Sequence, residues 1–183
     1  MALRAEIVAE DGAGWLPLGR DMSDEQVRRL VELWAGDAAP PTESVELILL
    51  GGDRSVFGGV RLTDSGARVD PGCCLLLEDW RSWVGVENGG WPDVGHDGPW
   101  LERDAEALTI WPRGAEDWRP EPVRDGLPVR VLYSQLPELR RSLQDDLRGL
   151  LDSLRRWADT NCPDSASALV AHADHVFAIT APV

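Results

Sequence analysis

Hydrophobic and polar positions alternate in several short segments of the chain, and this pattern predicts strands. Residues 3–8, "LRAEIV", place apolar side chains at every second position, which is typical of a half-buried strand. The run "VELILL" at 45–50 is almost entirely apolar, so we expect a central strand there, joined by a hairpin at 51–55 to a strand at 56–62. The same reasoning predicts two further strands, at 107–111 and 129–133.

In other segments apolar residues recur at spacings of three and four, which predicts helices. The first helix covers residues 23–35, where Ser23 and Gln26 form a capping box and Gly36 follows the last turn. Further helices are expected at 75–84, 134–158 and 164–177.

The helix predicted from Ser134, its expected cap, carries one long apolar stripe. Its members are Leu136, Leu139, Leu143, Leu147, Leu150, Leu154 and Trp157. Such a stripe can form the seam of a coiled-coil dimer, or it can cover a sheet within one chain. Three heptads barely reach the length that a coiled-coil seam needs. We therefore favour a core helix, and a homodimer through residues 134–158 stays the alternative to a monomer.

Together these elements predict a single α+β domain over residues 1–183. We expect a mainly antiparallel sheet of about five strands packed by three to four helices, one of them the long C-terminal helix. A chain of 183 residues is long enough to bury such a core without disulfides or metal ions.

The chain is strongly acidic, which narrows the classes of partner. Its 32 Asp and Glu residues against 18 Lys and Arg residues give a formal net charge of −14 at pH 7. Nucleic acids and anionic membrane surfaces are bound through Lys and Arg, so we expect neither as a partner. An acidic surface favours solubility and fast association with basic proteins.

The start of the chain and its cysteines indicate the cellular compartment of the protein. No basic segment followed by an apolar run is present at the start, so we expect no signal peptide, and apolar runs such as 47–50 are far too short to span a bilayer. Three cysteines, two of them adjacent, do not make a disulfide framework. We therefore expect a cytoplasmic protein.

The segment "DPGCCLLLEDWRSW" at 70–83 concentrates candidate chemistry. Cys73 and Cys74 would lie near the N-terminus of the helix expected at 75–84, where the helix dipole lowers the pKa of a thiol, and one could act as a nucleophile or redox sensor. A nucleophile needs a base within reach, and the three histidines sit in no recognisable protease or phosphatase signature. Cysteines beside three leucines behave mostly as small hydrophobes, so we favour burial of both.

Two further residue sets could bind a metal ion or serve in acid–base catalysis. The donors available for zinc are Cys73, Cys74, Cys162, His96, His172 and His175. Adjacent cysteines are awkward ligands for one zinc ion, and the histidine pair lacks further ligands at a suitable spacing. A second set could gather as an acid–base or hard-cation cluster: Glu78, Asp79, Asp93, His96 and Asp97. Turn chemistry explains these residues better, so we expect no metal ion, no cofactor and no assigned catalytic residue.

Residues 86–127 differ from the rest of the chain. They are rich in glycine, proline and tryptophan, show little regular periodicity and hold ten acidic residues against four arginines. Tryptophans within an acidic rim suit contact with a basic protein. The candidate partner surface is therefore formed by Trp91, Asp93, His96, Asp97, Trp100 and Trp118.

The motifs "DPGCCLLLEDWRSW", "GHDGPW" and "ALTIW", within residues 45–112, resemble a group of uncharacterised actinobacterial proteins with a P-G-C-C, acidic-Trp-Arg-x-Trp and G-H-D pattern. The resemblance implies a bacterial cytosolic protein of unknown function, and it assigns no functional residue. Size and acidity also resemble, loosely, immunity proteins that neutralise toxins. We expect a non-enzymatic protein-binding module, with an immunity or antitoxin-like inhibitor of a basic partner as its most specific form. The alternatives are a small enzyme using a Cys or the His96–Asp97 region, and a carbohydrate or small-ligand binder.

Overall fold

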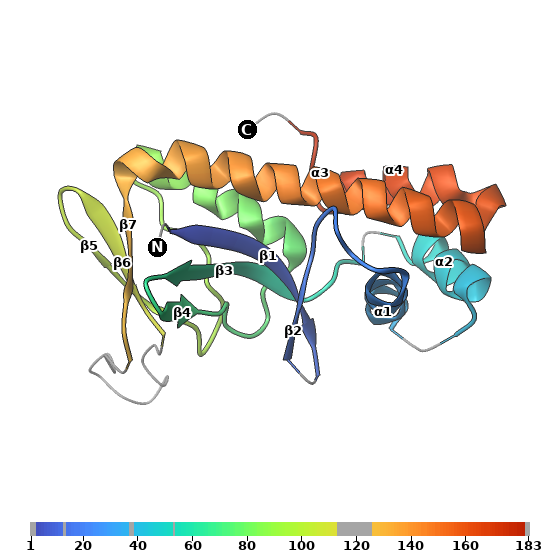
Figure 1. The fold of residues 1–183 in the computed structure, drawn as a ribbon, viewed down its shortest axis with the longest axis horizontal. Helices are drawn as coiled ribbons and strands as arrows, with labels where there is room; N and C mark the ends of the chain where they lie inside the picture. The colour runs from blue at the N-terminus through green and yellow to red at the C-terminus, as the bar shows by residue number, and fades with distance from the viewer. Residues whose placement is uncertain (1–2, 13, 37–38, 53, 113–125, 182–183) are drawn as a thin grey trace. The chain divides into compact units, whose positions relative to one another are not determined.

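The structure is a computed structural model that describes residues 3–12, 14–36, 39–52, 54–112 and 126–181, and it confirms the predicted α+β class (Figure 1). One sheet has the strand order β2-β1-β3-β4, and a second has the order β5-β6-β7. The strands are β1 (Arg4–Asp11), β2 (Gly14–Pro17), β3 (Gly58–Asp64), β4 (Ala67–Val69), β5 (Trp100–Arg103), β6 (Ala107–Trp111) and β7 (Val129–Leu132).

The helices are of two kinds. The α-helices are α1 (Asp24–Ala35), α2 (Pro41–Leu50), α3 (Leu136–Asn161) and α4 (Ala166–Val176). The 3-10 helices are η1 (Leu77–Asn88), η2 (Tyr133–Gln135) and η3 (Pro163–Ser165). Within the described residues, no helix combines the length and the apolar character needed to cross a membrane.

The chain divides into two compact units. The first consists of residues 1–7 and 57–143, and the second of residues 8–56 and 144–183. The strand β1 and the helix α3 each contribute residues to both units. The single domain expected over residues 1–183 stays a prediction.

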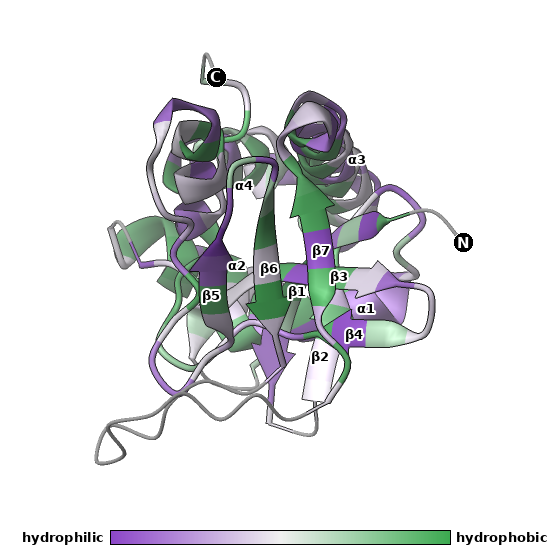
Figure 2. Ribbon diagram, turned by 90° about the vertical axis from the view of Figure 1, so that its left-hand side faces the viewer, coloured by the Kyte–Doolittle hydropathy of each residue, from purple (hydrophilic) through white to green (hydrophobic). Residues whose placement is uncertain are grey.

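The core of the first unit is built from the second sheet, from β3 and from η1. Figure 2 shows β7 as hydrophobic except for one hydrophilic band, which matches its alternation of buried and exposed residues. From η1, the rings of Trp80 and Trp83 are almost fully buried. The guanidinium of Arg61 on β3 is also buried, and its Nε donates to Asp70 Oδ1 at 2.6 Å. A buried arginine needs such a partner, so Asp70 has a structural task at this point of the chain.

In the second unit, α3 packs closely against the segment that follows β2. Ser153 Oγ lies 2.9 Å from the carbonyl oxygen of Gly19 and 2.8 Å from that of Arg20. A β-carbon on Gly149 would lie 2.6 Å from the backbone nitrogen of Arg20, so only glycine allows this approach. On α1, the ring of Trp34 stacks on His172 of α4 at a centroid distance of 5.5 Å.

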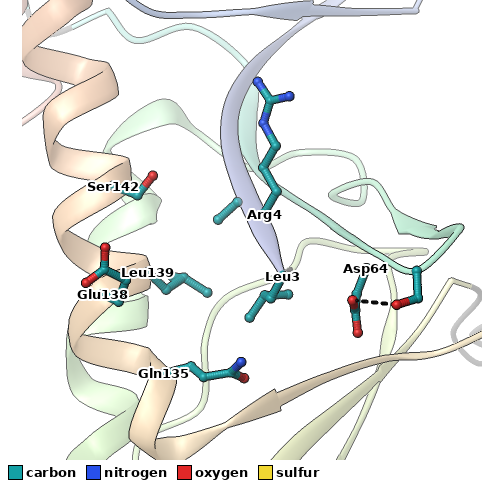
Figure 3. A pocket seen from close by; sticks show the side chains of 9 residues that line it. Leu3, Arg4, Asp64, Gln135, Glu138, Leu139 and Ser142 are labelled. Atoms are coloured by element: carbon teal, nitrogen blue, oxygen red, sulfur yellow. Dashed lines mark hydrogen bonds between the residues drawn. The ribbon is translucent and has the colours of Figure 1, made fainter. Parts of the chain in front are cut away.

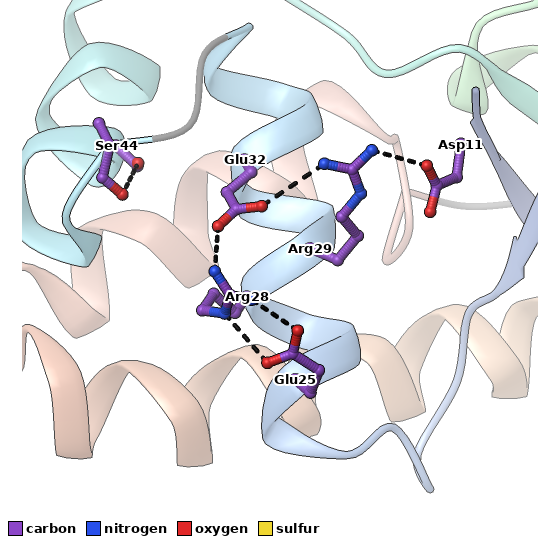
Figure 4. A network of polar contacts seen from close by, with 7 residues as sticks. Asp11, Glu25, Arg28, Arg29, Glu32 and Ser44 are labelled. Atoms are coloured by element: carbon purple, nitrogen blue, oxygen red, sulfur yellow. Dashed lines mark hydrogen bonds and ion pairs between the residues drawn. The ribbon is translucent and has the colours of Figure 1, made fainter. Parts of the chain in front are cut away.

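The helix α1 has the predicted termini and is joined to β1 by an ion pair. Ser23 and Gln26 form the capping box, and Gly36 ends the helix in the left-handed conformation. Figure 4 shows the polar network on α1, in which Arg29 Nη2 donates to Asp11 Oδ1 at 2.7 Å. Arg28 hydrogen-bonds Glu25 and thereby lowers the pKa of that carboxyl group. Arg28 and Glu25 are exposed and Arg29 and Asp11 are half-buried, so these ion pairs contribute little to stability.

The prediction of a strand at 45–50, and of a hairpin after it, is wrong. These residues belong to α2, in which Ser44, Val45 and Ile48 are buried while Leu47 and Leu50 are exposed. A short apolar run fits a buried strand and a buried helix equally well. The prolines at the start of α2 and Glu43 in its first turn are the helix signals that decide between them.

Other boundaries differ in detail. The helix expected at 75–84 is the 3-10 helix η1, which begins at Leu77 and ends at Gly89 in the left-handed conformation. Ser134 does not cap α3, because it lies inside η2 and α3 begins at Leu136. All seven residues of the apolar stripe on α3 are buried within the chain. The stripe is therefore covered without a second copy of the protein.

Candidate functional site

The two most distinctive motifs of the sequence pair with each other through their backbones. Gly72 N donates to Val94 O at 2.7 Å, Cys73 N donates to His96 O at 3.0 Å, and His96 N donates to Cys73 O at 3.1 Å. We call this backbone pairing of residues 72–73 with residues 94–96 the glycine clasp. It joins the start of "PGCC" to "GHDG", two segments more than twenty residues apart in the sequence.

Glycines allow the two backbones to approach this closely. A β-carbon on Gly72 would lie 2.5 Å from Gly98 Cα and 2.5 Å from His96 O. A β-carbon on Gly95, whose φ is +80°, would lie 2.5 Å from Cys73 O. Real β-carbons do not approach other atoms so closely. The glycines of both motifs therefore have a steric reason that is independent of any ligand.

The glycine clasp leaves both thiols exposed, which contradicts the prediction that they are buried. Cys73 lies in an isolated bridge with His96, and Cys74 has a φ of +65°, a left-handed conformation that residues other than glycine rarely adopt. The turn at Cys74 sends the chain toward Leu75, which is buried in place of the cysteines. The hydrophobic sequence around the cysteines had suggested the opposite.

The thiols also lack the activation expected from a helix dipole. The helix after them begins only at Leu77, and the hydrogen bond to the Cys74 side chain, together with desolvation, raises the pKa of the Cys73 thiol. The Cys73 Sγ also donates to the carbonyl oxygen of His96 at 3.3 Å. A thiol that keeps its proton is a poor nucleophile, so this environment does not favour covalent catalysis by Cys73.

The loop after η1 carries three predicted site residues at its surface. Asp93, His96 and Asp97 are all exposed. The backbone nitrogen of Asp93 donates to Ser82 Oγ of η1 at 2.8 Å, and Asp93 Oδ1 accepts a hydrogen bond from Gly95 N at 3.1 Å. These are the contacts of a turn, as the sequence suggested. They hold the loop in one conformation without using the outward-facing charges of His96 and Asp97.

Trp91 is the most exposed of the tryptophans that the structure describes, and it is held in place. Its side chain is 54 % exposed, and the guanidinium of Arg103 lies 4.4 Å from the centre of its ring. Arg103 in turn donates from Nη1 to Gly89 O at 2.8 Å and from Nη2 to Gly90 O. The Tyr133 ring flanks the same guanidinium at 5.9 Å. Sequence reasoning missed Arg103 and Tyr133, because the contact depends on strand pairing between β5, β6 and β7.

Trp100 and Trp118 are the remaining residues of the predicted partner surface. Trp100 is half-buried on β5, and among the described residues no acceptor lies within hydrogen-bond reach of its Nε1. Trp118 lies outside the described residues. Trp34, Trp80, Trp83 and Trp157 are buried and serve the core.

The residues considered for metal binding are not brought together. Cys162 is buried in the second unit, and desolvation raises the pKa of its thiol. His172 stacks on Trp34, whereas His175 is exposed. In the part of the chain that the structure describes, no group of three or more His, Cys, Asp or Glu residues has a geometry that could hold a metal ion.

A pocket of about 510 Å³ lies in the first unit, lined by the start of β1, the turn after β3 and the start of α3 (Figure 3). Its apolar lining residues are Leu3, Ala5 and Leu139, and its polar ones are Arg4, Asp64, Ser65, Gln135, Glu138 and Ser142. Arg4 is paired with Glu6 at 2.8 Å. Carboxylates and hydroxyls therefore dominate the polar lining, which suits a small ligand with a positive or hydrogen-bond-donating group. Of the predicted site residues that the structure describes, none lines this pocket.

Comparison of the chain with protein-family models, with curated proteins and with solved structures finds no match.

The steric role of the glycine clasp can be measured with one pair of substitutions. Gly95 and Gly66 both have a positive φ, but only Gly95 has backbone atoms in the path of a β-carbon. Gly66→Ala should lower the free energy of unfolding by about 1–2 kcal/mol, the cost of a left-handed alanine. Gly95→Ala should lower it by about 1–3 kcal/mol more, because the clasp must open. Urea denaturation measures both values, and equal losses would contradict the contact.

The raised pKa of Cys73 predicts slow alkylation. A raised pKa leaves less thiolate at neutral pH, so iodoacetamide should react with Cys73 more slowly in the folded protein than in the urea-unfolded chain. The difference should shrink as the pH rises through the folded pKa, since Cys73 is exposed and access does not limit it. Peptide mapping by mass spectrometry gives the rate at each pH. If the alkylation rate of the folded protein rises with pH at the same pH as that of the unfolded chain, or at a lower pH, the raised pKa of Cys73 is contradicted.

Proposed function

We propose that this protein is a non-enzymatic binding module for a basic protein partner, and that the contact surface is centred on Trp91, Asp93, His96 and Asp97. The observation that carries the proposal is the exposed Trp91 ring held against Arg103. An immunity or antitoxin-like inhibitor is the kind of module that suits these features. A cytoplasmic location goes with the same proposal, as does kinship with the actinobacterial group that the motifs resemble.

An exposed aromatic ring that is already ordered is a favourable binding anchor. Tryptophan buries a large area and keeps one polar atom, which is why it is frequent among the residues that dominate interface energy. Because Arg103 holds one face of the Trp91 ring, little conformational entropy remains to be lost on binding. The opposite situation, a tryptophan that must be ordered by its partner, would weaken the complex.

Charge supports the same choice of partner. The chain carries a formal net charge of −14, and Asp93 and Asp97 are exposed within six residues of Trp91. Arg103 lies in this region, but its guanidinium is engaged by the carbonyl oxygens of Gly89 and Gly90. An acidic rim around an aromatic anchor attracts a basic surface and accelerates encounter at low salt.

The pocket in Figure 3 supports a second candidate function, the binding of a small organic amine. Its volume of about 510 Å³ lies within the range of small-molecule sites. Asp64 can receive a positive group, whereas Glu138 is already paired with Arg141 at 2.8 Å. Leu3 and Leu139 can contact an apolar stem. No aromatic ring of the described residues lines the pocket, so stacking on a sugar ring has no support there.

Substitution of Trp91 should strongly reduce recovery of the partner. Trp91→Ala should reduce recovery of a basic partner about 30-fold, equivalent to about 2 kcal/mol of binding free energy. Phe57→Ala is the matched control, because Phe57 is also 54 % exposed and lies in the same unit. The products of neighbouring genes, purified one at a time, are the baits for a pull-down. Equal losses for both variants would contradict a specific role of Trp91.

The contribution of the acidic side chains to partner binding can be tested separately, with a second acidic residue as the control. Asp97→Asn keeps a residue that tolerates the left-handed backbone at that position and removes one negative charge. It should slow association at low salt, whereas Asp159→Asn, an exposed change on α3, should not. Recovery that is insensitive to salt and to both substitutions would count against a basic partner.

The second candidate function can be separated from the first. A set of small primary and secondary amines should include compounds that raise the midpoint of thermal unfolding of the wild-type protein, because binding stabilises the folded state. Ser142→Trp fills the pocket and should remove the effect, whereas Ser167→Trp, an exposed change on α4, should retain it. An absence of any stabilising amine, or equal stabilisation of both variants, would exclude the pocket as their site.

A further inference from the structure

We propose that Cys73 and Cys74 are an oxidant-responsive pair, which closes to a disulfide between adjacent residues under peroxide and reopens with cellular thiols. The two are free, adjacent in sequence and both exposed. They therefore differ from a single surface cysteine, since each thiol has a second one as its nearest reaction partner. Cys73 touches the proposed partner contact through His96, but the proposal does not depend on that contact.

The local backbone keeps the two thiols together. The glycine clasp holds Cys73 through hydrogen bonds of both its backbone groups to His96. The left-handed conformation of Cys74, with φ at +65°, turns the chain directly after it. The neighbouring Cys74 side chain is the main cause of the raised pKa of the Cys73 thiol. Residues other than glycine adopt such a conformation only where the surroundings impose it, and these positions are often functional.

The reaction balances with peroxide as the oxidant. The thiol of Cys74, as its thiolate, attacks the peroxide: an S–O bond forms, the O–O bond breaks, and the leaving hydroxide takes a proton to become water. The neighbouring thiol then attacks the sulfenic sulfur, so that the S–S bond forms and the oxygen leaves as a second water. Two thiols lose two hydrogens and two electrons, and one peroxide is reduced. The Cys73 hydrogen bond to the carbonyl of His96 is lost with its proton.

The disulfide should be easily reduced because its geometry is strained. The Cα atoms of adjacent residues lie about 3.8 Å apart across a trans peptide bond, whereas the Cα atoms of a relaxed disulfide lie about 4.4–6.8 Å apart. Strained and exposed disulfides have more oxidising potentials and are the labile ones. Glutathione should therefore reopen the pair, which makes it a reversible mark and not a structural crosslink.

Cys162 provides an internal control in the same chain. It is buried, so peroxide and alkylating reagents should reach it slowly in the folded protein. Trypsin separates it from the pair, since cleavage at Arg68 and Arg81 releases residues 69–81 with both Cys73 and Cys74. The oxidation state of the pair is then read from one peptide without interference from Cys162.

The experiment treats the folded full chain with stoichiometric hydrogen peroxide, quenches it with catalase, unfolds it and alkylates the remaining thiols. We expect the peptide of residues 69–81 to lose two hydrogens and to take no alkyl group, while Cys162 is alkylated. Reduced glutathione should then restore all three alkylable thiols. Cys73→Ser and Cys74→Ser should each abolish the loss of two hydrogens, and Cys162→Ser should retain it.

Several outcomes would overturn the proposal. They are a pair that stays reduced, a pair that accumulates sulfinic acid, crosslinked dimers through Cys73 or Cys74, and a disulfide that glutathione does not reduce. The mass of the peptide of residues 69–81 is measured on the wild-type protein, so it tests the proposal even if a variant misfolds. Far-UV circular dichroism before and after peroxide checks that the reaction occurred in the folded protein.

Discussion

The backbone pairing in the glycine clasp is the constraint on which the candidate surface depends. It brings the cysteine motif and the loop with His96 into contact, and three glycines make that contact sterically feasible. The pairing satisfies backbone groups of both loops, so the side chains between them are free to face solvent. Exposure of Cys73, Cys74, His96 and Asp97 follows from this arrangement.

Two arginines of the first unit, Arg61 and Arg103, are engaged inside it and add little positive charge to its surface. Arg61 is buried against Asp70, and Arg103 binds the carbonyl oxygens of Gly89 and Gly90 beneath Trp91. Each of these guanidiniums has several donors in a fixed plane, which lets it hold more than one acceptor. Their charge is therefore less available to an incoming partner than the carboxylates of Asp93 and Asp97. Arg61 and Arg103 therefore order this surface without neutralising its negative charge.

Local signals allowed parts of the fold to be predicted from the sequence. The capping box of Ser23 and Gln26, the strand at 107–111 and the apolar stripe of α3 are all confirmed, because each depends on residues close in the chain. The error at 45–50 has a different cause: a run of apolar residues has no period that separates strand from helix, and two of its leucines are exposed. The prolines before that run were the better guide.

The candidate site was harder to predict because its geometry depends on contacts between distant segments. Leucines beside Cys73 and Cys74 suggested burial, but the left-handed turn at Cys74 separates the thiols from the leucines that enter the core. The glycines at 72, 95 and 98 carried a signal, since glycine marks close backbone approach, yet a single sequence does not show which glycines meet. Their meeting places Cys73 in direct contact with the loop of His96. A chemical change at the thiols would therefore reach the loop of Asp93 and Asp97 through the backbone that both share.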